Sequence, residues 1–446
     1  MTERLKKALA SARETRACMI GETVLKEVPA LFREQFSGAK AVIVADTTTF
    51  DVAGRTVRDA LKAAGLSAGT PYVFSAAGLF AEMSHVDRLT SALQAHNTVP
   101  VAVGSGTIND LTKLAAHRCG RPYMCVGTAA SMDGYAAFGA SITSSGCKQT
   151  FTCPAPRALV ADLDVFCKAP SAMTVSGYAD LMAKVVCGAD WILADALETE
   201  AIDPRAWESV QGGLRDALAD PAGARVGDKR AIALLAEGLL LSGFAMQHTR
   251  TSRPASGAEH QFSHLWDMER HTYLGAAPSH GFKVGVATRF LAALYEQMLD
   301  EPFGRLEVSA ACGQWPEWPV AEVNTRTLFA GTDISDLGVQ ETRAKYVSRA
   351  QLAHHLTQLK RLWPVLKPRL RAQLFTASDV KRRLETVGAP SEPEQIGVSR
   401  ARLRDSVIRA QRIRRRFTVL DVAVRTGRLN VWLNGLFGKG KIWETS

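Results

Sequence analysis

Histidines gather in one stretch of the chain. Five of the ten histidines lie between positions 248 and 280, namely His248, His260, His264, His271 and His280. His260 and His264 are four residues apart in a helical pattern, so we expect their imidazoles on one helix face about a turn apart. That spacing suits a metal ion or a metal ion with its substrate, and it also suits a hydrogen-bonded polar face. His280, directly before Gly281, is a further candidate ligand, whereas we expect His271 to be structural or to support a ligand.

Asp180 is an acid in an otherwise apolar stretch at residues 177–181. Burial of a carboxylate is costly unless the group is paired or bound to a cation. Asp180 is therefore a candidate metal ligand, because a catalytic site commonly includes one carboxylate. The alternatives are that it caps a helix or pairs with Lys184.

Two loops of small residues could bind a phosphate. The first loop follows an apolar run and precedes a helical pattern, and it consists of Gly104, Ser105, Gly106, Thr107, Ile108, Asn109 and Asp110. Small residues let the backbone approach an anion, and the amides at a helix N-terminus face a phosphate. The loop lacks the full dinucleotide pattern, since Asn109 stands where a third glycine would be, so an ordinary turn remains an alternative.

The second loop follows the next apolar run and consists of Gly127, Thr128, Ala129, Ala130 and Ser131. Ligands of parallel sheets bind beyond the carboxyl ends of adjacent strands, so both loops should face the same ligand. Asp46 ends an earlier apolar run and could accept hydrogen bonds from an adenosine ribose. It is equally suited to cap a helix.

The elements that carry these residues change along the chain. Apolar runs at residues 41–45, 99–103 and 123–126, separated by a helical pattern at 53–64, indicate buried parallel strands. We expect Asn109 or Asp110 to cap the helix between the last two runs. From about Pro170 helical periodicity dominates, at residues 175–197, 229–249, 259–273 and 280–299. The pattern predicts an α/β Rossmann-like domain with a parallel sheet at 1–168 and an all-α domain at 169–446.

Smaller signals mark the ends of later helices. We expect Pro364 and Pro368 to bracket a break, and Gly388 to end a helix before Ser399 begins another.

Composition limits the class of protein. The formal charge of +10 would suit an anionic substrate or nucleic acid. Much of the excess lies in arginines near the C-terminus, namely Arg400, Arg402, Arg404, Arg409, Arg412, Arg414, Arg415 and Arg416. No aromatic residues alternate with them, so we expect a solvated helix face and no nucleic-acid partner. The eight cysteines show no CxxC spacing and follow no signal peptide, which predicts reduced thiols and a cytoplasmic protein. The apolar stretch 231–246 includes Glu237 and is shorter than the ~20 residues of a membrane span, so we expect a buried helix.

Taken together, these segments resemble the sn-glycerol-1-phosphate dehydrogenases, within the iron-containing alcohol dehydrogenase and dehydroquinate synthase-like superfamily. The resemblance covers nearly the whole chain. Its most specific segments are residues 104–110, 131–135, 161–164, 259–264 and 280–281. Residues 388–390 through 418–421 resemble the bacterial branch associated with arabinose-utilisation operons. The fold that this resemblance implies is the dehydroquinate synthase-like one.

The resemblance implies the following site. NAD(H) or NADP(H) would lie on Gly104, Ser105, Gly106, Thr107 and Ile108 and on Thr128, Ala129, Ala130 and Ser131, with Asp46 near the ribose. Asp180, His260 and His280 would hold one divalent zinc, nickel or iron ion, and Asp133 and His264 would meet the substrate. Lys148, Lys184 and Lys283 lie near these motifs and are the candidate phosphate ligands. Two residues depart from the pattern, because Ala137 replaces a serine expected near the cofactor and Phe282 replaces an acid common in polyol dehydrogenases.

The reaction implied is the interconversion of dihydroxyacetone phosphate and sn-glycerol 1-phosphate, by a homo-oligomer of two or more chains that takes part in phospholipid metabolism. One alternative on the same scaffold is a sugar-phosphate cyclase related to dehydroquinate synthase, and another is a polyol or glycerol dehydrogenase. The segment 131–135 favours the dehydrogenase of the glycerol phosphate.

Overall fold

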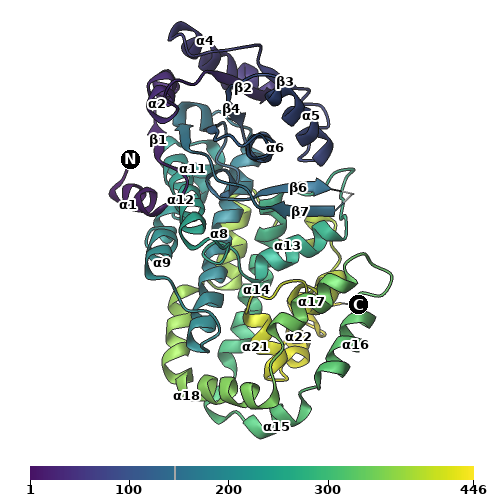
Figure 1. Ribbon diagram of the computed structural model, residues 1–446. Coiled ribbons are helices and arrows are strands. Elements are labelled where there is room, and N and C mark those ends of the chain that lie inside the picture. Colours follow the sequence, from purple (N-terminus) through teal and green to yellow (C-terminus); the bar gives the residue numbers. More distant parts are fainter. Residues whose placement is uncertain (145–146, 446) are drawn as a thin grey trace. The chain divides into compact units, whose positions relative to one another are not determined.

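A parallel sheet of six strands organises the first part of the chain (Figure 1). In the computed structural model, which describes residues 1–144 and 147–445, the strand order is β1-β8-β5-β4-β2-β3. The strands are β1 (Ala17–Gly21), β2 (Ala41–Asp46), β3 (Tyr72–Phe74), β4 (Val99–Gly104), β5 (Met124–Gly127) and β8 (Ala158–Asp162). Every residue of β4, β5 and β8 is buried, which explains why these strands are unbroken apolar runs. The predicted α/β architecture is confirmed.

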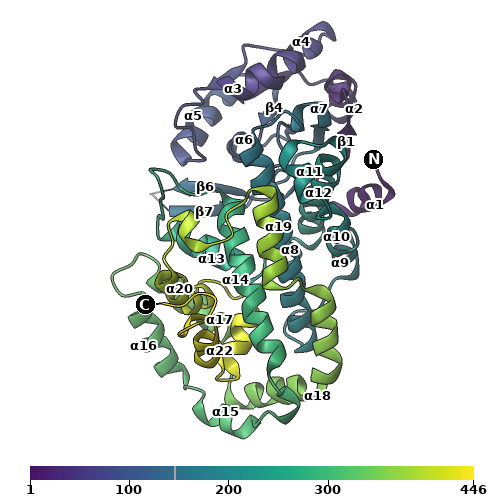
Figure 2. The ribbon, with the colours of Figure 1, turned by 180° about the vertical axis from the view of Figure 1, so that it is seen from behind.

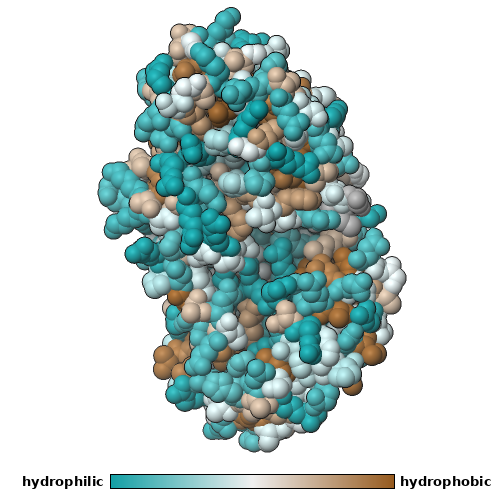
Figure 3. All heavy atoms as spheres, viewed as in Figure 1, coloured by the Kyte–Doolittle hydropathy of each residue, from teal (hydrophilic) through white to brown (hydrophobic). Residues whose placement is uncertain are grey.

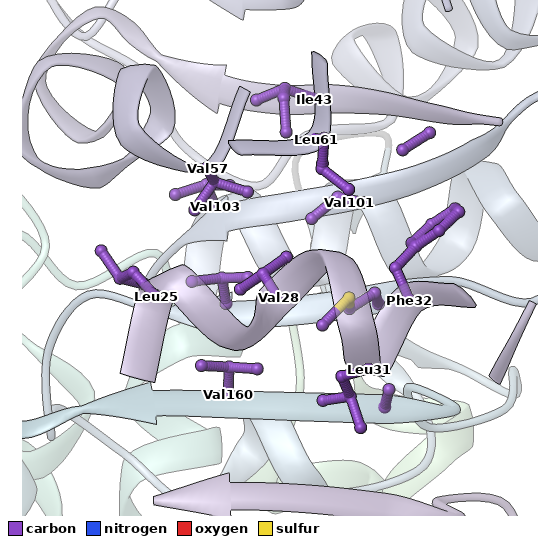
Figure 4. Packing of buried hydrophobic residues seen from close by; sticks show 14 of the residues in the cluster. Leu25, Val28, Leu31, Phe32, Ile43, Val57, Leu61, Val101, Val103 and Val160 are labelled. Carbon is purple, nitrogen blue, oxygen red and sulfur yellow. The ribbon is translucent and has the colours of Figure 1, made fainter. Parts of the chain in front are cut away.

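Short helices surround the sheet. They are α1 (Glu3–Ser11), η1 (Val24–Glu27), α2 (Val28–Gln35), α3 (Thr47–Thr49), η2 (Phe50–Gly54), α4 (Arg55–Ala63), α5 (Met83–Gln94), α6 (Gly106–Arg118), η3 (Gly134–Ala136) and α7 (Leu163–Phe166). A separate antiparallel pair consists of β6 (Ala140–Ser144) and β7 (Cys147–Phe151). On one face of the sheet, Val28 and Leu31 of α2 and Val57 of α4 pack over Val101 and Val160 (Figure 4). This packing fixes the sheet whose strand ends carry the glycine loops.

The strand ends are in register. Gly104 at the end of β4 pairs with Gly127 at the end of β5, and Gly127 pairs with Ala161 of β8. The loops that follow β4 and β5 therefore begin at one edge of the sheet.

After β8 the described residues contain helices and no strand, as the sequence predicts. By contacts the chain forms two compact units. Unit 1 comprises Met1–Leu181, Arg205–Ser252 and Thr386–Gly388, and unit 2 comprises Met182–Pro204, Arg253–Glu385 and Ala389–Ser446. The long helix α8 (Ser171–Ala196) contributes residues to both units. The boundary predicted between residues 168 and 169 lies in the connection from α7 to α8 and stays a prediction.

Four more helices of unit 1 follow α8 in the chain, and the last of them is long and apolar. They are α9 (Pro204–Gln211), α10 (Leu214–Ala217), α11 (Pro221–Val226) and α12 (Lys229–Thr249). Helix α12 is long and apolar enough to cross a membrane, but 72% of its apolar window is buried inside the structure. It is a core helix, as expected for residues 231–246. The face drawn in Figure 3 is mainly hydrophilic, and its hydrophobic residues form separate patches.

Unit 2 consists of helices. They are α13 (Ala258–Met268), α14 (His280–Asp300), η4 (Phe303–Arg305), α15 (Val308–Gln314), α16 (Trp318–Leu328), α17 (Ser335–Lys345), α18 (Arg349–Gln373), α19 (Ala377–Val387), η5 (Pro393–Ile396), α20 (Arg400–Arg412), α21 (Val419–Arg425) and α22 (Leu429–Phe437). Helix α14 packs against α13 and α22, and Figure 2 shows these helices from behind. The sequence predicted α13 five residues too long at its end, since the helix stops at Met268.

The prolines of α18 correct another expectation. Pro364 and Pro368 lie inside the helix, so the predicted break was wrong. The helix buries Leu352, Leu356, Leu359, Trp363, Leu366 and Leu370. This stripe continues at helical spacing across both prolines, so packing offsets the hydrogen bonds that the prolines remove. The other stop is confirmed, because α19 ends at Val387 before Gly388, whose φ is 91°, and Ser399 caps α20.

The C-terminal arginines do not form the expected solvated face. Arg402 and Arg409 of α20 are half-buried, and each pairs with Glu269, at 2.9 and 2.7 Å. Among the eight, Arg415 alone is exposed, and it pairs with Glu341. Most of these arginines are therefore partly buried between helices. Sequence periodicity alone does not reveal this.

Candidate functional site

The first glycine loop turns directly into a helix. Helix α6 begins at Gly106 after Ser105, whose side chain makes no capping hydrogen bond. Asn109 and Asp110 lie inside the helix and do not cap it, which corrects the prediction. A Cβ added at Gly104 would lie 2.6 Å from Cβ of Ile108, so only glycine lets the helix start so close to the strand. The N-terminal amides of α6 are thus left without a side-chain cap, an arrangement that suits a phosphate group.

The second loop lies against the first. The backbone N–H of Thr128 donates to the carbonyl of Gly104 across 3.1 Å. A Cβ added at Gly106 would lie 3.3 Å from Sδ of Met132, so the segment after Ser131 packs on the start of α6. The two loops therefore lie side by side, as the strand order requires. Their role in binding a dinucleotide stays a prediction.

Asp46 acts as a helix cap. Its Oδ1 accepts the backbone N–H of Thr49 at 2.8 Å, and the Thr49 hydroxyl contacts the N–H of Asp46 at 3.1 Å. This reciprocal capping box accounts for the acid at the end of β2. Contact with a ribose would use the remaining lone pairs of the carboxylate and stays a prediction.

A buried lysine on α6 fixes the next segment. The Lys113 ammonium donates to the carbonyl groups of Gly134, Ala137 and Gly139 at 2.9, 2.9 and 2.8 Å, and its side chain has no exposed area. Its carboxylate neighbour Asp110, 3.4 Å away, also accepts the N–H of Ser141. The helix that begins at the glycine loop thereby holds the segment that contains Asp133. Sequence reasoning missed Lys113, although an Asp and a Lys three residues apart in an apolar helix were a usable signal.

Asp180 lies in the interior of α8 and contacts the same segment. Its Oδ2 accepts the backbone N–H of Asp133 at 3.1 Å, and both side chains are buried. Because Asp180 is far from the start of α8, the capping alternative is wrong. A Cβ added at Gly177 would lie 1.9 Å from the carbonyl oxygen of Ala130, so this glycine allows α8 to approach the loop.

Three histidine rings converge in unit 2. His260 and His264 lie on α13, and His280 is the first residue of α14, where Ser279 is the cap. The ring centroids are 5.1 Å apart for His260 and His280, 6.3 Å for His260 and His264, and 6.4 Å for His264 and His280. His260 is buried, and the other two are partly exposed.

One atom from each of Asp180, His260 and His280 forms a group whose members all lie within 4.8 Å of one another. Two imidazole nitrogens and a carboxylate oxygen suit a catalytic divalent metal and leave a coordination position for a substrate. The donor set therefore fits the metal that the sequence predicts, and it does not select among zinc, nickel and iron.

Neighbouring groups contact His260 and His280 at their Nδ1 atoms. Nδ1 of His260 lies 2.7 Å from Oε1 of Glu259, and that oxygen also accepts the N–H of Gly257 at 2.6 Å. Because a buried carboxylate accepts a hydrogen bond, we assign the ring hydrogen to Nδ1, which places the lone pair of the neutral ring on Nε2. Nδ1 of His280 lies 3.4 Å from the Ser263 hydroxyl. The sequence motif at residues 259–264 includes Glu259 but does not indicate its role. Only the contact with His260 reveals that role.

A second buried carboxylate supports the start of α13. Asp190 accepts the N–H of Ala258 at 2.7 Å, the hydroxyl of Tyr295 at 2.6 Å and the N–H of Val419 at 2.8 Å. Burial, and then the charge of Glu259, raise the pKa of Asp190 to about 7. No sequence pattern pointed to Asp190, because its partners are remote in the chain.

The remaining predicted residues have separate surroundings. His271 is structural, since Nε2 lies 2.7 Å from the carbonyl of Ile396 and Nδ1 lies 2.8 Å from Arg402. Lys283 is buried and pairs with Asp267. Lys184 is buried in α8. The side chain of Lys148, in β7, lies outside the described residues. The phosphate role of the three lysines stays a prediction.

Comparison with known proteins identifies a matching family model and several relatives. The model of the iron-containing alcohol dehydrogenase family matches residues 19–170. A glycerol-1-phosphate dehydrogenase (NAD(P)+) of Halalkalibacterium halodurans is 34% identical over 279 residues, which are 62% of this chain and 70% of that protein. The protein of the same name from Methanosarcina mazei is 31% identical over 341 residues, 76% of this chain and 87% of that protein.

A similar fold occurs in a crystal structure of a probable glycerol dehydrogenase from Sinorhizobium meliloti, with a TM-score of 0.60 and 15% identity. The match covers 95% of this chain and 98% of the other. At that identity the likeness concerns the fold alone, an α/β sheet domain followed by helices. The family model and the identity to the two relatives above show that the chain belongs to the iron-containing alcohol dehydrogenase family.

Proposed function

We propose that this chain is a metal-dependent, NAD(P)-linked dehydrogenase that interconverts dihydroxyacetone phosphate and sn-glycerol 1-phosphate. The observation that carries the proposal is the group of Asp180, His260 and His280, whose His260 ring is oriented by Glu259. The substrate comes from relatives at 31–35% identity that are named for glycerol 1-phosphate.

The dinucleotide, NAD(H) or NADP(H), would bind on the two glycine loops. Its pyrophosphate would lie at the start of α6, on the backbone amides of Gly104, Ser105, Gly106, Thr107 and Ile108, where the first three residues have small side chains or none. Thr128, Ala129, Ala130 and Ser131 would line the same position, and Asp46 would reach the ribose. Lys113 would act indirectly, by holding the segment that follows these loops.

A divalent metal, when bound to Asp180, His260 and His280, would supply Lewis acidity that polarises the ketone of the substrate. The dinucleotide, when bound, would supply a hydride to the carbonyl carbon, and the oxygen would take up one proton. His264 would exchange that proton with solvent. Its partial exposure and its distance of 6.3 Å from His260, between ring centroids, support this role. Asp133 would hold a substrate hydroxyl.

The phosphate group of the substrate requires cations, for which Lys148, Lys184 and Lys283 are the proposed ligands. Lys283 would exchange part of its contact with Asp267 for the phosphate. We further propose a homo-oligomer in the cytoplasm, consistent with the seven described cysteines, none of which forms a disulfide.

The test follows oxidation of NADH and of NADPH by dihydroxyacetone phosphate, after metal removal and reloading with zinc, nickel or iron. We expect metal-dependent turnover that His260→Ala abolishes and Glu269→Gln, a change at the far end of α13, preserves. Reduction of NAD⁺ or NADP⁺ by glycerol at a comparable rate would indicate a polyol dehydrogenase instead. Product formed from a sugar phosphate without net dinucleotide oxidation would indicate a cyclase.

A further inference from the structure

A second candidate site lies in unit 2 and shares no residue with the metal group. It is a cavity of about 170 Å³ among α15, α16, α17, α20 and α21. For comparison, one water occupies roughly 30 Å³ of the liquid, so the cavity has room for a small polyatomic ion. We name it the arginine cavity. The polar and charged lining residues used in the argument are Thr342, Lys345, Arg412, Asp421 and Arg425.

The charges of the arginine cavity do not balance. Three cations, Lys345, Arg412 and Arg425, line it together with one carboxylate, Asp421. Asp421 is 2% exposed, pairs with Lys345 at 3.0 Å and also accepts Nε2 of Gln411 at 2.8 Å. One cation is thereby compensated, which leaves two positive charges.

The two guanidinium groups have neutral partners. Arg412 donates to the carbonyl of Ala321 at 3.3 Å and to the hydroxyl of Thr325. Arg425 donates to Nδ1 of His355 at 2.8 Å and to the carbonyl of Lys345 at 3.0 Å. Burial, and then Arg425 itself, lower the pKa of His355 to about 4, so the ring is a neutral acceptor. Within residues 1–144 and 147–445, neither guanidinium forms an ion pair with a carboxylate.

Burial makes this imbalance costly. The side chain of Lys345 is 7% exposed, and Arg425 as a whole residue is 6% exposed. Burial lowers the pKa of Arg412 with no opposing carboxylate. Buried charges are ordinarily paired. Two polar atoms here, Nε of Arg412 and Oγ1 of Thr342, are also buried without a hydrogen-bond partner. The arginine cavity therefore has both uncompensated positive charge and unsatisfied hydrogen-bonding groups.

We infer that the arginine cavity binds a phosphate dianion. Two uncompensated charges match the charge of a phosphate monoester or of inorganic phosphate near neutral pH. Guanidinium groups bind such oxygens through paired N–H donors, and a threonine hydroxyl adds another donor. Trp315 and Tyr346 form one wall, with rings 5.9 Å apart, and their polar atoms are already bonded to Val347 and Pro316. That wall limits the size of the ligand.

The experiment measures phosphate binding by calorimetry and by thermal unfolding, with chloride at matched ionic strength as reference. Wild type, Arg412→Gln and Thr342→Val are compared with Arg415→Gln, which removes a neighbouring exposed arginine outside the cavity. We expect phosphate to raise the unfolding temperature of wild type and Arg415→Gln. In Arg412→Gln the dissociation constant should rise at least tenfold, and in Thr342→Val severalfold. Thr342→Val keeps the side-chain shape and carries the test if Arg412→Gln does not fold.

A phosphate effect that is absent in wild type, or equally large in Arg412→Gln, would overturn the inference. Repeating the titration with glycerol phosphate in His260→Ala distinguishes the sources, since tighter binding of the ester than of inorganic phosphate identifies an organic ligand. The result is independent of the proposed dehydrogenase, because turnover of dihydroxyacetone phosphate is measured separately in each variant.

Discussion

The carboxylate of Glu259 contacts Nδ1 of His260 across 2.7 Å, and both side chains are buried. Since the same oxygen also accepts the N–H of Gly257, the carboxylate is fixed at the start of α13 and fixes the ring in turn. Carboxylates that orient a metal-binding histidine also raise its basicity. The strength of metal binding should therefore depend on a residue that does not itself bind the metal.

Glu259→Gln should weaken metal binding about 10- to 100-fold, because it removes the charge and preserves the shape. The measurement is the dissociation constant for zinc in competition with a chelator, without substrate. Glu269→Gln is the matched control, since it makes the same change at the other end of the helix. Equal affinity in the two variants would exclude the orienting role.

The histidine cluster illustrates what the sequence could predict. The spacing of His260 and His264 placed both on one helix face, and His280 at the start of α14 followed from the adjacent helical pattern. Such local periodicities survive folding because a helix fixes the direction of each side chain. The same holds for α12, where the predicted and observed bounds coincide at Lys229–Thr249.

Contacts between residues that lie far apart in the sequence were not predictable. Lys113 meets carbonyl groups more than twenty positions away, and Asp190 meets Val419. No local pattern encodes these contacts. The break predicted at Pro364 and Pro368 was wrong for a related reason. The buried apolar stripe of α18 outweighs the local tendency of proline to end a helix.

Replacement of His264 should separate proton transfer from metal binding. We expect His264→Ala to lower kcat by about 10²- to 10⁴-fold, because a proton-exchanging side chain is lost. Metal content, measured by elemental analysis of the purified protein, should remain near that of wild type. His260→Ala serves as the reference that loses metal. Should His264→Ala lose metal in proportion to activity, His264 would be a ligand.

Gly177 is required by the close approach of α8 to the second glycine loop. In Gly177→Ala the new Cβ would lie 1.9 Å from the carbonyl oxygen of Ala130, so the loop must move. We expect the free energy of unfolding to fall by about 1–3 kcal/mol, measured by urea denaturation. Gly313→Ala in α15 is the control, because nothing lies within 4 Å of its added Cβ. That variant should gain up to about 1 kcal/mol from helix propensity. Equal effects would show that the loop adapts without cost.

Asp190 should make stability depend on pH. Its pKa is raised to about 7 in the folded chain, chiefly by burial, whereas an unfolded aspartate titrates near pH 3.9. From roughly pH 4 to 7 the folded chain retains a proton that the unfolded chain has released, so its stability falls as pH rises. Asp190→Asn lacks this titration. The unfolding free energy of wild type minus that of Asp190→Asn should therefore decrease across this window, by an amount on the order of a few kcal/mol. A difference that stays constant or increases with pH would show that the carboxylate is already ionised at low pH and that its three hydrogen-bond donors outweigh burial.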